Sequence, residues 1–267
     1  MIISQTRLQI WQSNKEKARI TYPWNLEPLV KGRGLQRGGA LHLLIEGRFK
    51  GWRDIEVAQM MLDNDINDSD AVREAEWMYP AFLSARDNRG VSQQESEKDI
   101  EVPIGDKHSI RVILDEVCQD MGRVKIGDFK TTVEGFWCTP AALQKQWDND
   151  IQVDFGLIGA KHMGIDTNEA LITTIIAPKN GGDYKVEFTC TSRTDEQLER
   201  TKRWANMEAD TMEMYEERFG IEDPWPHTPH LDKWCKKDCP FRELCEKPAS
   251  QWDLSFWQQR KERSKRV

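Results

Sequence analysis

The chain has no uninterrupted apolar run that approaches the roughly 20 residues of a membrane-spanning helix. Its first residues, Met-Ile-Ile-Ser-Gln-Thr-Arg, lack the layout of a signal peptide. It also lacks a Walker-type phosphate loop and any internal repeat, which argues against an ATP-driven motor. These absences predict a protein of the reducing cytoplasm that makes no membrane contact, whose cysteines are not presumed to form disulfides.

The chain also has no excess of basic residues, as its net charge of -7 and its pI of about 5.4 show. This argues against broad electrostatic coating of nucleic acid. It does not exclude a nuclease, because bound metal neutralises an acidic site and local basic patches steer a substrate. The basic run at residues 260–266 is one candidate patch, although a solvated chain end is the simpler interpretation.

Two runs rich in isoleucine and valine, residues 109–117 and 123–132, are expected to pair as an antiparallel hairpin. A two-residue turn at Met121-Gly122 would join them, with Gly122 supplying the positive φ that such a turn requires. This register places Asp115 directly opposite Asp128, with Cβ atoms about 5 Å apart.

Two carboxylates this close repel each other unless a cation lies between them. Lys130 follows Asp128 by two residues and therefore points to the same side of the strand. Hard oxygen ligands suit Mg²⁺ or Mn²⁺, and two acids with a lysine are the set that metal-assisted phosphodiester hydrolysis requires. The alternative interpretation is two solvent-facing acids on an exposed hairpin.

The order of elements predicts an α/β fold with a mixed central sheet flanked by helices. Helices are expected from Ser4 to about Ala18, over residues 38–46 with Gly47 as the stop, over 54–65, over 69–87 with Pro80 bending or splitting it, from Thr139-Pro140 to His162, and from the capping box at Thr194 to Phe219. A second strand pair is expected at residues 171–178 and 184–191, and a loop at 89–101.

Three cysteines close to the C-terminus, Cys235, Cys239 and Cys245, suggest a metal-binding turn. Soft thiolates select zinc or an iron–sulfur cluster, and both normally need four ligands. His227 or His230 could complete a zinc site, and a turn without metal is the alternative. The other three cysteines, Cys118, Cys138 and Cys190, are predicted to be buried apolar residues.

With these residues in hand, the chain resembles the PD-(D/E)XK nuclease superfamily. More narrowly, it resembles the RecB-like and CRISPR-adaptation exonucleases with a C-terminal cysteine cluster, many of which phages encode. The motifs that carry the resemblance occur in the expected order over most of the chain: Gly38–His42, Ile113–Asp115, Gly127–Lys130, Gln152 with Phe155, and the cysteine triplet.

The resemblance implies a restriction-endonuclease-like core over residues 1–220 and a cysteine-rich clasp with a basic tail over residues 221–267. It also implies a metal site made by His42, Asp115, Asp128 and the Phe129 carbonyl. Lys130 would orient or deprotonate the attacking water, and Gln152 would help to place the lysine or the scissile phosphate. Glu46, one helical turn after His42, would orient it or hold a water, or would be a solvated helix end.

The implied activity is a DNA exonuclease or end-processing nuclease of recombination, replication or repair. Its substrate would be single-stranded or frayed DNA, its products would carry a 5′-phosphate, and its location would be the host cytoplasm if a phage encodes it. Recombination or replication proteins are candidate partners. The competing hypothesis is an inactive nuclease fold that serves as a DNA-binding or assembly subunit, against which the complete Asp-Asp-Lys set argues.

Three positions depart from the family pattern. Val112-Ile113 replaces a glycine before Asp115, and Phe155 stands one place early after Gln152. Asn14 stands where the family has its N-terminal cluster cysteine. A three-cysteine cluster with another ligand, a zinc site with a histidine, and a vestigial site therefore all remain open.

Overall fold

The computed structural model describes residues 1–28, 31–222, 224–225, 241–245, 247 and 249–259. The chain forms two compact units. The terminal unit contains Met1–Lys31, Pro103–Arg111 and Lys202–Val267, and the central unit contains Gly32–Val102 and Val112–Thr201. None of the described helices is long and apolar enough to cross a membrane. The predicted division at residue 220 stays a prediction, since the residues beyond it are described only in part.

The predicted mixed sheet is present, with helices on both sides. Its strands in the central unit are β3 (Ser92–Pro103), β4 (Ser109–Asp120, from Val112 on), β5 (Arg123–Val133), β6 (Glu169–Ala177) and β7 (Lys185–Ser192). Their order is β4-β5-β6-β7, and β3 pairs with β4. The β4–β5 and β6–β7 pairs are antiparallel whereas β5 and β6 are parallel, so the sheet is mixed.

The hairpin between β4 and β5 has the predicted register. Residues 116–120 pair with residues 123–127, so Glu116 faces Gly127. Met121 and Gly122 form the turn with φ of 52° and 77°, the two positive values that a type I′ turn requires. A glycine at the second position and a flexible methionine at the first therefore set which residues meet across the strands.

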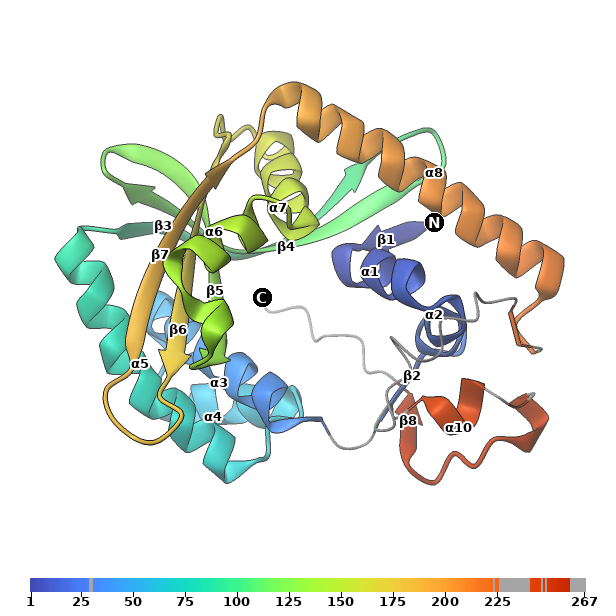
Figure 1. The fold of residues 1–267 in the computed structure, drawn as a ribbon, viewed down its shortest axis with the longest axis horizontal. Coiled ribbons are helices and arrows are strands. Elements are labelled where there is room, and N and C mark those ends of the chain that lie inside the picture. Colours follow the sequence, from blue (N-terminus) through green and yellow to red (C-terminus); the bar gives the residue numbers. More distant parts are fainter. Residues whose placement is uncertain (29–30, 223, 226–240, 246, 248, 260–267) are drawn as a thin grey trace. The chain divides into compact units, whose positions relative to one another are not determined.

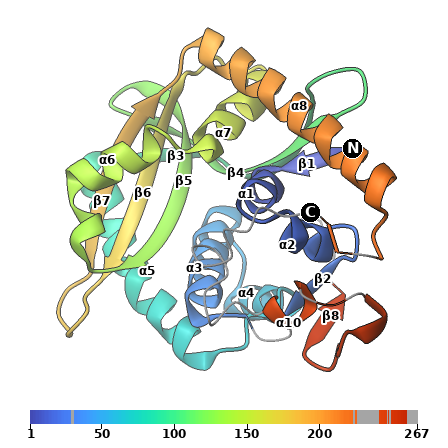
Figure 2. The same ribbon diagram turned by 45° about the vertical axis from the view of Figure 1, so that its right-hand side comes forward.

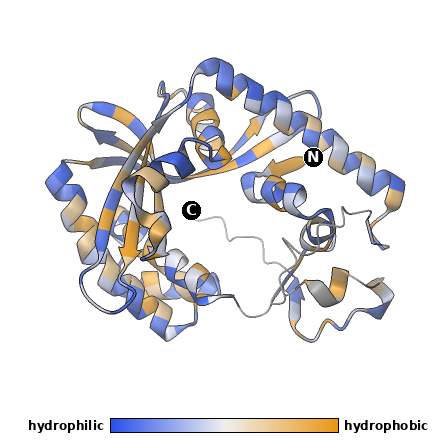
Figure 3. Cartoon of the chain, in the orientation of Figure 1, coloured by the Kyte–Doolittle hydropathy of each residue, from blue (hydrophilic) through white to orange (hydrophobic). Residues whose placement is uncertain are grey.

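Helices cover both faces of this sheet (Figures 1 and 2). They are α3 (Arg33–Lys50), α4 (Asp54–Asp63), α5 (Ser69–Arg89), α6 (Pro140–Trp147) and α7 (Ile151–His162). Phe129 of β5 packs among the apolar residues of α3, α4 and α5, whereas Ile126 lies against Gly156 of α7. Residues three apart on a strand point to opposite faces, so the two helix groups lie on opposite sides. The central strand β6 is accordingly buried along nearly its whole length and carries hydrophobic colour in Figure 3.

The predicted helix stop at Gly47 is wrong. Helix α3 begins earlier, at Arg33, and continues through Gly47 to Lys50. A Cβ atom on Gly47 would lie 2.6 Å from Cγ2 of Val57 in α4, so this glycine allows two helices to approach closely. The helix ends instead at Gly51, whose φ of 68° is the left-handed conformation typical of a helix end.

The predicted loop at residues 89–101 is also wrong, because β3 runs through most of it. Its polar side chains hide the strand from a hydrophobic pattern, and pairing with β4 overrides their weak strand propensity. The helix predicted from Thr139-Pro140 to His162 is two helices. Asp150 separates them, because its carboxylate accepts the backbone N–H of Gln152 and starts α7.

The other predicted elements of the central unit are confirmed. Helices α4 and α5 and strands β6 and β7 lie within a few residues of their predicted bounds. The predicted split at Pro80 is wrong, because α5 runs through it as one helix. Thr194 and Gln197 form the predicted capping box, in which each side chain accepts the other's backbone N–H, at the start of α8 (Asp195–Phe219).

The terminal unit contains short elements and most of α8. They are β1 (Ile2–Ser4), α1 (Gln5–Ser13), α2 (Lys15–Thr21), β2 (Leu26–Pro28), α10 (Arg242–Cys245), a 3₁₀ turn at Ala249–Gln251 and β8 (Trp257–Gln259). Strand β1 pairs in parallel with Ser109–Arg111, the first residues of β4, and β2 pairs with β8. The single helix predicted from Ser4 to Ala18 is divided by Asn14, whose side chain accepts the Lys17 N–H and caps α2.

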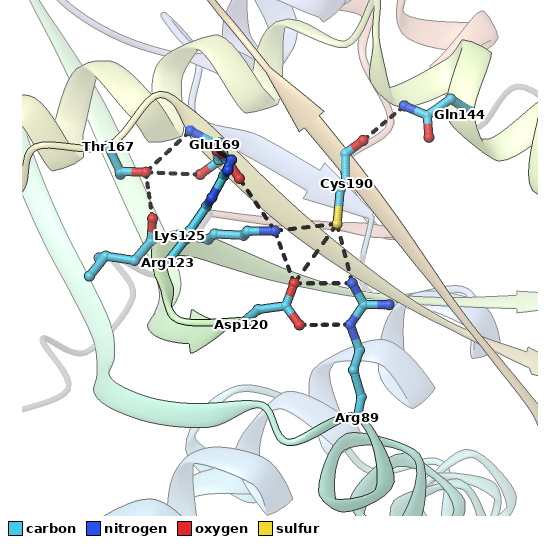
Figure 4. A network of polar contacts seen from close by, with 9 residues as sticks. Arg89, Asp120, Arg123, Lys125, Gln144, Thr167, Glu169 and Cys190 are labelled. Atoms are coloured by element: carbon cyan, nitrogen blue, oxygen red, sulfur yellow. Dashed lines mark hydrogen bonds and ion pairs between the residues drawn. The ribbon is translucent and has the colours of Figure 1, made fainter.

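The prediction of buried cysteines holds in part. Cys118 is fully buried and Cys138 is half-buried. Cys190 is exposed, so the prediction is wrong for this residue. The reason is its position on the edge strand β7, where its thiol lies 3.4 Å from Arg89 and 3.5 Å from Lys125 in a polar network (Figure 4).

Candidate active site

Four elements of the central unit bring the predicted site residues together. Helix α3 supplies His42, β4 supplies Asp115, β5 supplies Asp128, Phe129 and Lys130, and α7 supplies Gln152. The side chains of the histidine, the two acids and the lysine are between 12% and 30% exposed. They are therefore mostly shielded from water but remain accessible, which argues against the alternative of two acids on an exposed hairpin.

Asp115 lies where the ladder between β4 and β5 ends. The last described pair is Glu116 with Gly127, and beyond it the Asp115 Oδ2 atom accepts the backbone N–H of Phe129 at 3.1 Å. Its other oxygen, Oδ1, lies 3.4 Å from Nδ1 of His42. The Asp115 carboxylate thus takes the place of a backbone carbonyl as the acceptor for Phe129. A charged side chain therefore lies where β4 and β5 stop pairing.

His42 connects α3 to the same point of β5. Its Nε2 atom lies 2.9 Å from the carbonyl oxygen of Phe129. Both backbone polar groups of Phe129 are therefore held by side chains, the N–H by Asp115 and the carbonyl by His42. The Phe129 ring points to the opposite face and packs edge-on against Phe82 in the core.

Asp128 is held by two polar side chains on the α7 side of the sheet. Lys130 Nζ lies 2.9 Å from Oδ1 and 2.7 Å from Oδ2, and Gln152 Nε2 donates to Oδ1 at 2.7 Å. The Lys130 ammonium also lies 5.8 Å from the ring centre of Trp147 in α6. The lysine is thus fixed between an acid and an aromatic ring instead of extending into solvent.

The two acids titrate in opposite directions. Burial raises the pKa of Asp128 to about 7, the neighbouring Asp115 adds to this, and Lys130 opposes it. Burial would also raise the pKa of Asp115, but His42 and Lys130 outweigh it and hold that pKa below the usual range.

The two basic groups remain cationic more readily than in water. Burial would lower the pKa of His42, but the attraction of Asp115 outweighs it, so the pKa is raised. Burial would likewise lower the pKa of Lys130, and Asp128 and Asp115 raise it above the ordinary value. The two acids thus favour the charged forms of these two basic groups.

The donor set suits a hard or borderline divalent cation. His42 Nε2 and the Phe129 oxygen are 2.9 Å apart and share a hydrogen bond, which a metal ion bound by both atoms would replace. The buried Asp128 Oδ2 atom makes no hydrogen bond in the described structure, and its contact is the Lys130 ammonium at 2.7 Å. The chemistry of two carboxylates, a carbonyl and an imidazole suits Mg²⁺ or Mn²⁺. In the arrangement that the structure describes, the ligand atoms of His42, Asp115 and Asp128 do not all lie within 4.8 Å of one another, so a bound ion would draw them closer together.

A buried ion pair next to the site has no counterpart in the sequence analysis. Arg86 of α5 donates to both oxygens of Glu116, at 2.7 and 2.8 Å, and Glu116 is fully buried. Its side chain crosses Gly127, where a Cβ atom would lie 2.1 Å from the Glu116 Oε1 atom. The glycine before Asp128 is therefore required by the neighbouring strand, and the pair anchors β4 to α5 one residue beyond Asp115.

Glu46 is buried, so it is not a solvated helix end. Its Oε1 atom lies 2.9 Å from Lys50 Nζ one turn further along α3. A separate polar group lies in the terminal unit, where His108 contacts Asp210 at 3.0 Å and Glu213 at 3.7 Å. The amino group of Met1 lies 3.1 Å from the same histidine ring and donates to the Lys107 carbonyl, so hydrogen bonding explains this group.

The predicted cysteine site is described at one position. Cys245 lies in an apolar cluster with Ile20, Leu26, Phe241 and Leu244 of the terminal unit. Cys235, Cys239, His227 and His230 lie outside the described residues. The iron–sulfur or zinc site stays a prediction.

No family model matches this chain. No curated protein matches it either. Among solved structures, one titled "Crystal structure of SSO0001" has a TM-score of 0.32 and 12% sequence identity, over 74% of this chain and 83% of that chain. This likeness is too weak to carry an argument about fold or function, so the functional proposal depends on the geometry of the site.

Proposed function

We propose that the chain is a divalent-metal-dependent nuclease with a PD-(D/E)XK-type active site on a restriction-endonuclease-like sheet. The observation that carries this proposal is one cluster along β5, in which His42 and Asp115 contact the backbone of Phe129 and Lys130 contacts the preceding Asp128. The phosphodiester would be that of DNA, with single-stranded or frayed ends as the substrate and recombination, replication or repair as the setting.

The two acids, His42 Nε2 and the Phe129 oxygen would hold Mg²⁺ or Mn²⁺. The ion supplies charge neutralisation at the phosphate and a lower pKa for a coordinated water. Asp115 has a second task, because it accepts the Phe129 N–H and so holds the backbone next to the carbonyl that His42 contacts. His42 comes from a different layer of the fold and completes the set from the side of α3.

Lys130 supplies positive charge at the phosphate that reacts. Its ammonium lies between the Asp128 carboxylate and the Trp147 ring, so it is held in place before the substrate arrives. From there it donates to an oxygen of the phosphate and stabilises the negative charge that develops there. Gln152 holds Asp128 at Oδ1 and keeps the lysine and the carboxylate in register.

The test is hydrolysis of end-labelled single- and double-stranded DNA with Mn²⁺ or Mg²⁺. Asp128→Ala and Lys130→Met should each lower the rate by about 10²–10⁴-fold, the usual contribution of such groups. Asp166→Asn is a matched control, because Asp166 is fully exposed and outside the site. Equal rates in the wild type and both site variants, or no hydrolysis with either metal, contradict the enzyme and leave the inactive DNA-binding subunit as the alternative.

A further inference from the structure

Two large aromatic rings are exposed just beyond the catalytic strand. β5 ends at Val133, and a 3₁₀ turn at Phe136–Cys138 follows it. Phe136 is 87% exposed and Trp137 is 49% exposed. Their ring centres are 5.0 Å apart at an interplanar angle of 77°, so they form one edge-to-face pair. Both residues lie in the central unit, as does the site.

The pair is held in position by its own segment. The Trp137 ring lies against Gly135, where a Cβ atom would meet ring carbons at 2.5–2.7 Å, so only glycine leaves room for it. The indole N–H donates to the Thr132 hydroxyl at 3.4 Å. Thr139 then caps α6 by accepting the Ala142 N–H, which fixes the other end of the turn. The rings are therefore presented by a defined turn.

The contact with Thr132 places the pair on the face of the active site. Side chains alternate along a strand, so Thr132 shares a face with Asp128 and Lys130. Thr132 is two positions along the strand from Lys130, which is a distance of about 7 Å. That is about two repeats of a stacked nucleic-acid strand at about 3.4 Å each. A strand whose phosphate lies at Lys130 would bring its next bases to these rings.

We infer that Phe136 and Trp137 stack on unpaired bases of the DNA strand that is being cut. The inference rests on the proposed nuclease function and adds how its substrate is selected. Stacking accepts every base but requires it to be unpaired, because the faces of paired bases are covered by their neighbours. The pair thus favours single-stranded or frayed ends without reading their sequence.

A second protein copy is a poorer occupant. Two aromatic side chains bury at most about 150–250 Å² each, well below the roughly 800 Å² per partner of a stable interface. The backbone phosphates need cations instead, and Lys130 lies on this face next to Asp128. Aromatic rings that stack on bases, together with positive charge along the backbone, are the combination by which proteins hold single strands.

The experiment compares a short labelled oligothymidylate with an abasic oligonucleotide of equal length, which keeps the phosphates and removes the bases. Affinities are measured by fluorescence anisotropy, with Ca²⁺ in place of Mn²⁺ and at one salt concentration. The wild type should bind the strand with bases about 5- to 100-fold more tightly, as expected for one stacked base. Phe136→Ala with Trp137→Ala should bring this ratio close to one.

Trp77→Ala is the matched control, because Trp77 is 56% exposed on α5 of the same unit and should leave the ratio unchanged. Phe136→Tyr should keep the wild-type ratio, because it retains an aromatic ring at this position. A wild-type ratio near one overturns the inference without any variant, as does an unchanged ratio in the double variant. Light scattering tests for a dimer. If the wild type is a dimer that Phe136→Ala dissociates, a second copy covers the aromatic pair, and the stacking inference is overturned.

Failure of the proposed function is seen separately. Mn²⁺-dependent hydrolysis of bis(p-nitrophenyl) phosphate by the wild type tests the site without any DNA base. If the ester is hydrolysed but the affinity ratio between the two oligonucleotides is near one, only the stacking inference is refuted. A large ratio without hydrolysis of this ester or of DNA refutes the nuclease alone and supports the base contact.

Discussion

At the scale of single residues, Asp115 and Asp128 of the candidate active site affect the stability of the fold in opposite directions. Asp115 is paired with His42 and accepts the Phe129 N–H, so its charge is favourable in the folded chain. Asp128 is buried beside it, and its pKa of about 7 shows that its charge is unfavourable despite Lys130. Functional sites often contain such unfavourable interactions, which lower the stability of the fold.

The consequence is a prediction for the metal-free protein at pH 8. Asp128→Asn should raise the free energy of unfolding by on the order of 1–3 kcal/mol, and Asp115→Asn should lower it by a similar amount. The Asp128 penalty is fully present above its folded pKa of about 7 and disappears as the pH falls towards the ordinary value of 3.8. Urea unfolding in chelator at pH 8 and pH 5 measures both effects, and the same sign for both variants at pH 8 contradicts the argument.

The sequence signals of the site differ in strength from residue to residue. Asp128 and Lys130 are recognisable because alternation along one strand is enough to place them on one side. The role of Gly127 is not recognisable, because it depends on the side chain of Glu116 crossing from another strand to Arg86. A single sequence does not reveal which arginine of a distant helix meets a given acid.

Elements with strong local signals were predictable. The hairpin register follows from Met121-Gly122, since a two-residue turn leaves one way to pair the strands. Strand β3 was not predictable, because its polar composition resembles a loop and its partner strand decides its conformation. The break between α6 and α7 depends on Asp150 acting as a cap in the middle of a helical pattern.

The far end of the hairpin is anchored by a polar network (Figure 4). Fully buried Asp120 accepts from Arg89 of α5 at 2.8 and 3.0 Å and from Lys125 of β5 at 2.9 Å. The same lysine lies 3.4 Å from Glu169 of β6. The network therefore joins α5 to the strand pair whose other end carries Asp115 and Asp128.

This network predicts how the hairpin responds to acid. The hydrogen bond from Arg89 is the main reason that the pKa of Asp120 falls to about 2, with Lys125 adding to it and burial opposing it. A depressed pKa stabilises the fold above the ordinary value of 3.8, and this contribution is lost as the pH falls through about 2. Asp120→Asn should cost about 2 kcal/mol at pH 6, and the gap to the wild type should narrow between about pH 4 and pH 2.

Urea unfolding at several pH values measures that gap. Asp166→Asn serves as the control, because its fully exposed carboxylate should give no gap at any pH. A gap for Asp120→Asn that stays constant down to the lowest accessible pH would show that packing, and not charge, is what the aspartate contributes.

At the scale of the whole molecule, the two metal sites proposed from the sequence fall in different compact units and differ in chemistry. Every ligand of the candidate active site belongs to the central unit, whereas the predicted cysteine site belongs to the terminal unit. Oxygen-rich sites suit Mg²⁺ and Mn²⁺, and thiolates suit zinc or iron–sulfur clusters. The two kinds of metal should therefore be removable and replaceable independently.

Hydrogen exchange followed by mass spectrometry tests this separation. Saturating Mn²⁺ should slow amide exchange in α3, β4 and β5 of the central unit, because a ligand at about 100 times its Kd stabilises the folded state by about 2.7 kcal/mol. Exchange in α1 and α2 of the terminal unit should not change. The variant with both Asp115→Asn and Asp128→Asn should lose the protection, because Mn²⁺ then has neither carboxylate ligand.

Protection of α1 and α2 by Mn²⁺ would contradict the separation, since it would mean either a second Mn²⁺ site or one cooperative unfolding of both units. The double variant decides between these two readings. Protection that survives in it must come from a site outside the central unit, with the acids around His108 as the nearest candidates. If the double variant loses the Mn²⁺ protection in both units, one metal site controls the unfolding of both. Amide exchange in the whole chain would then depend on the carboxylates of Asp115 and Asp128.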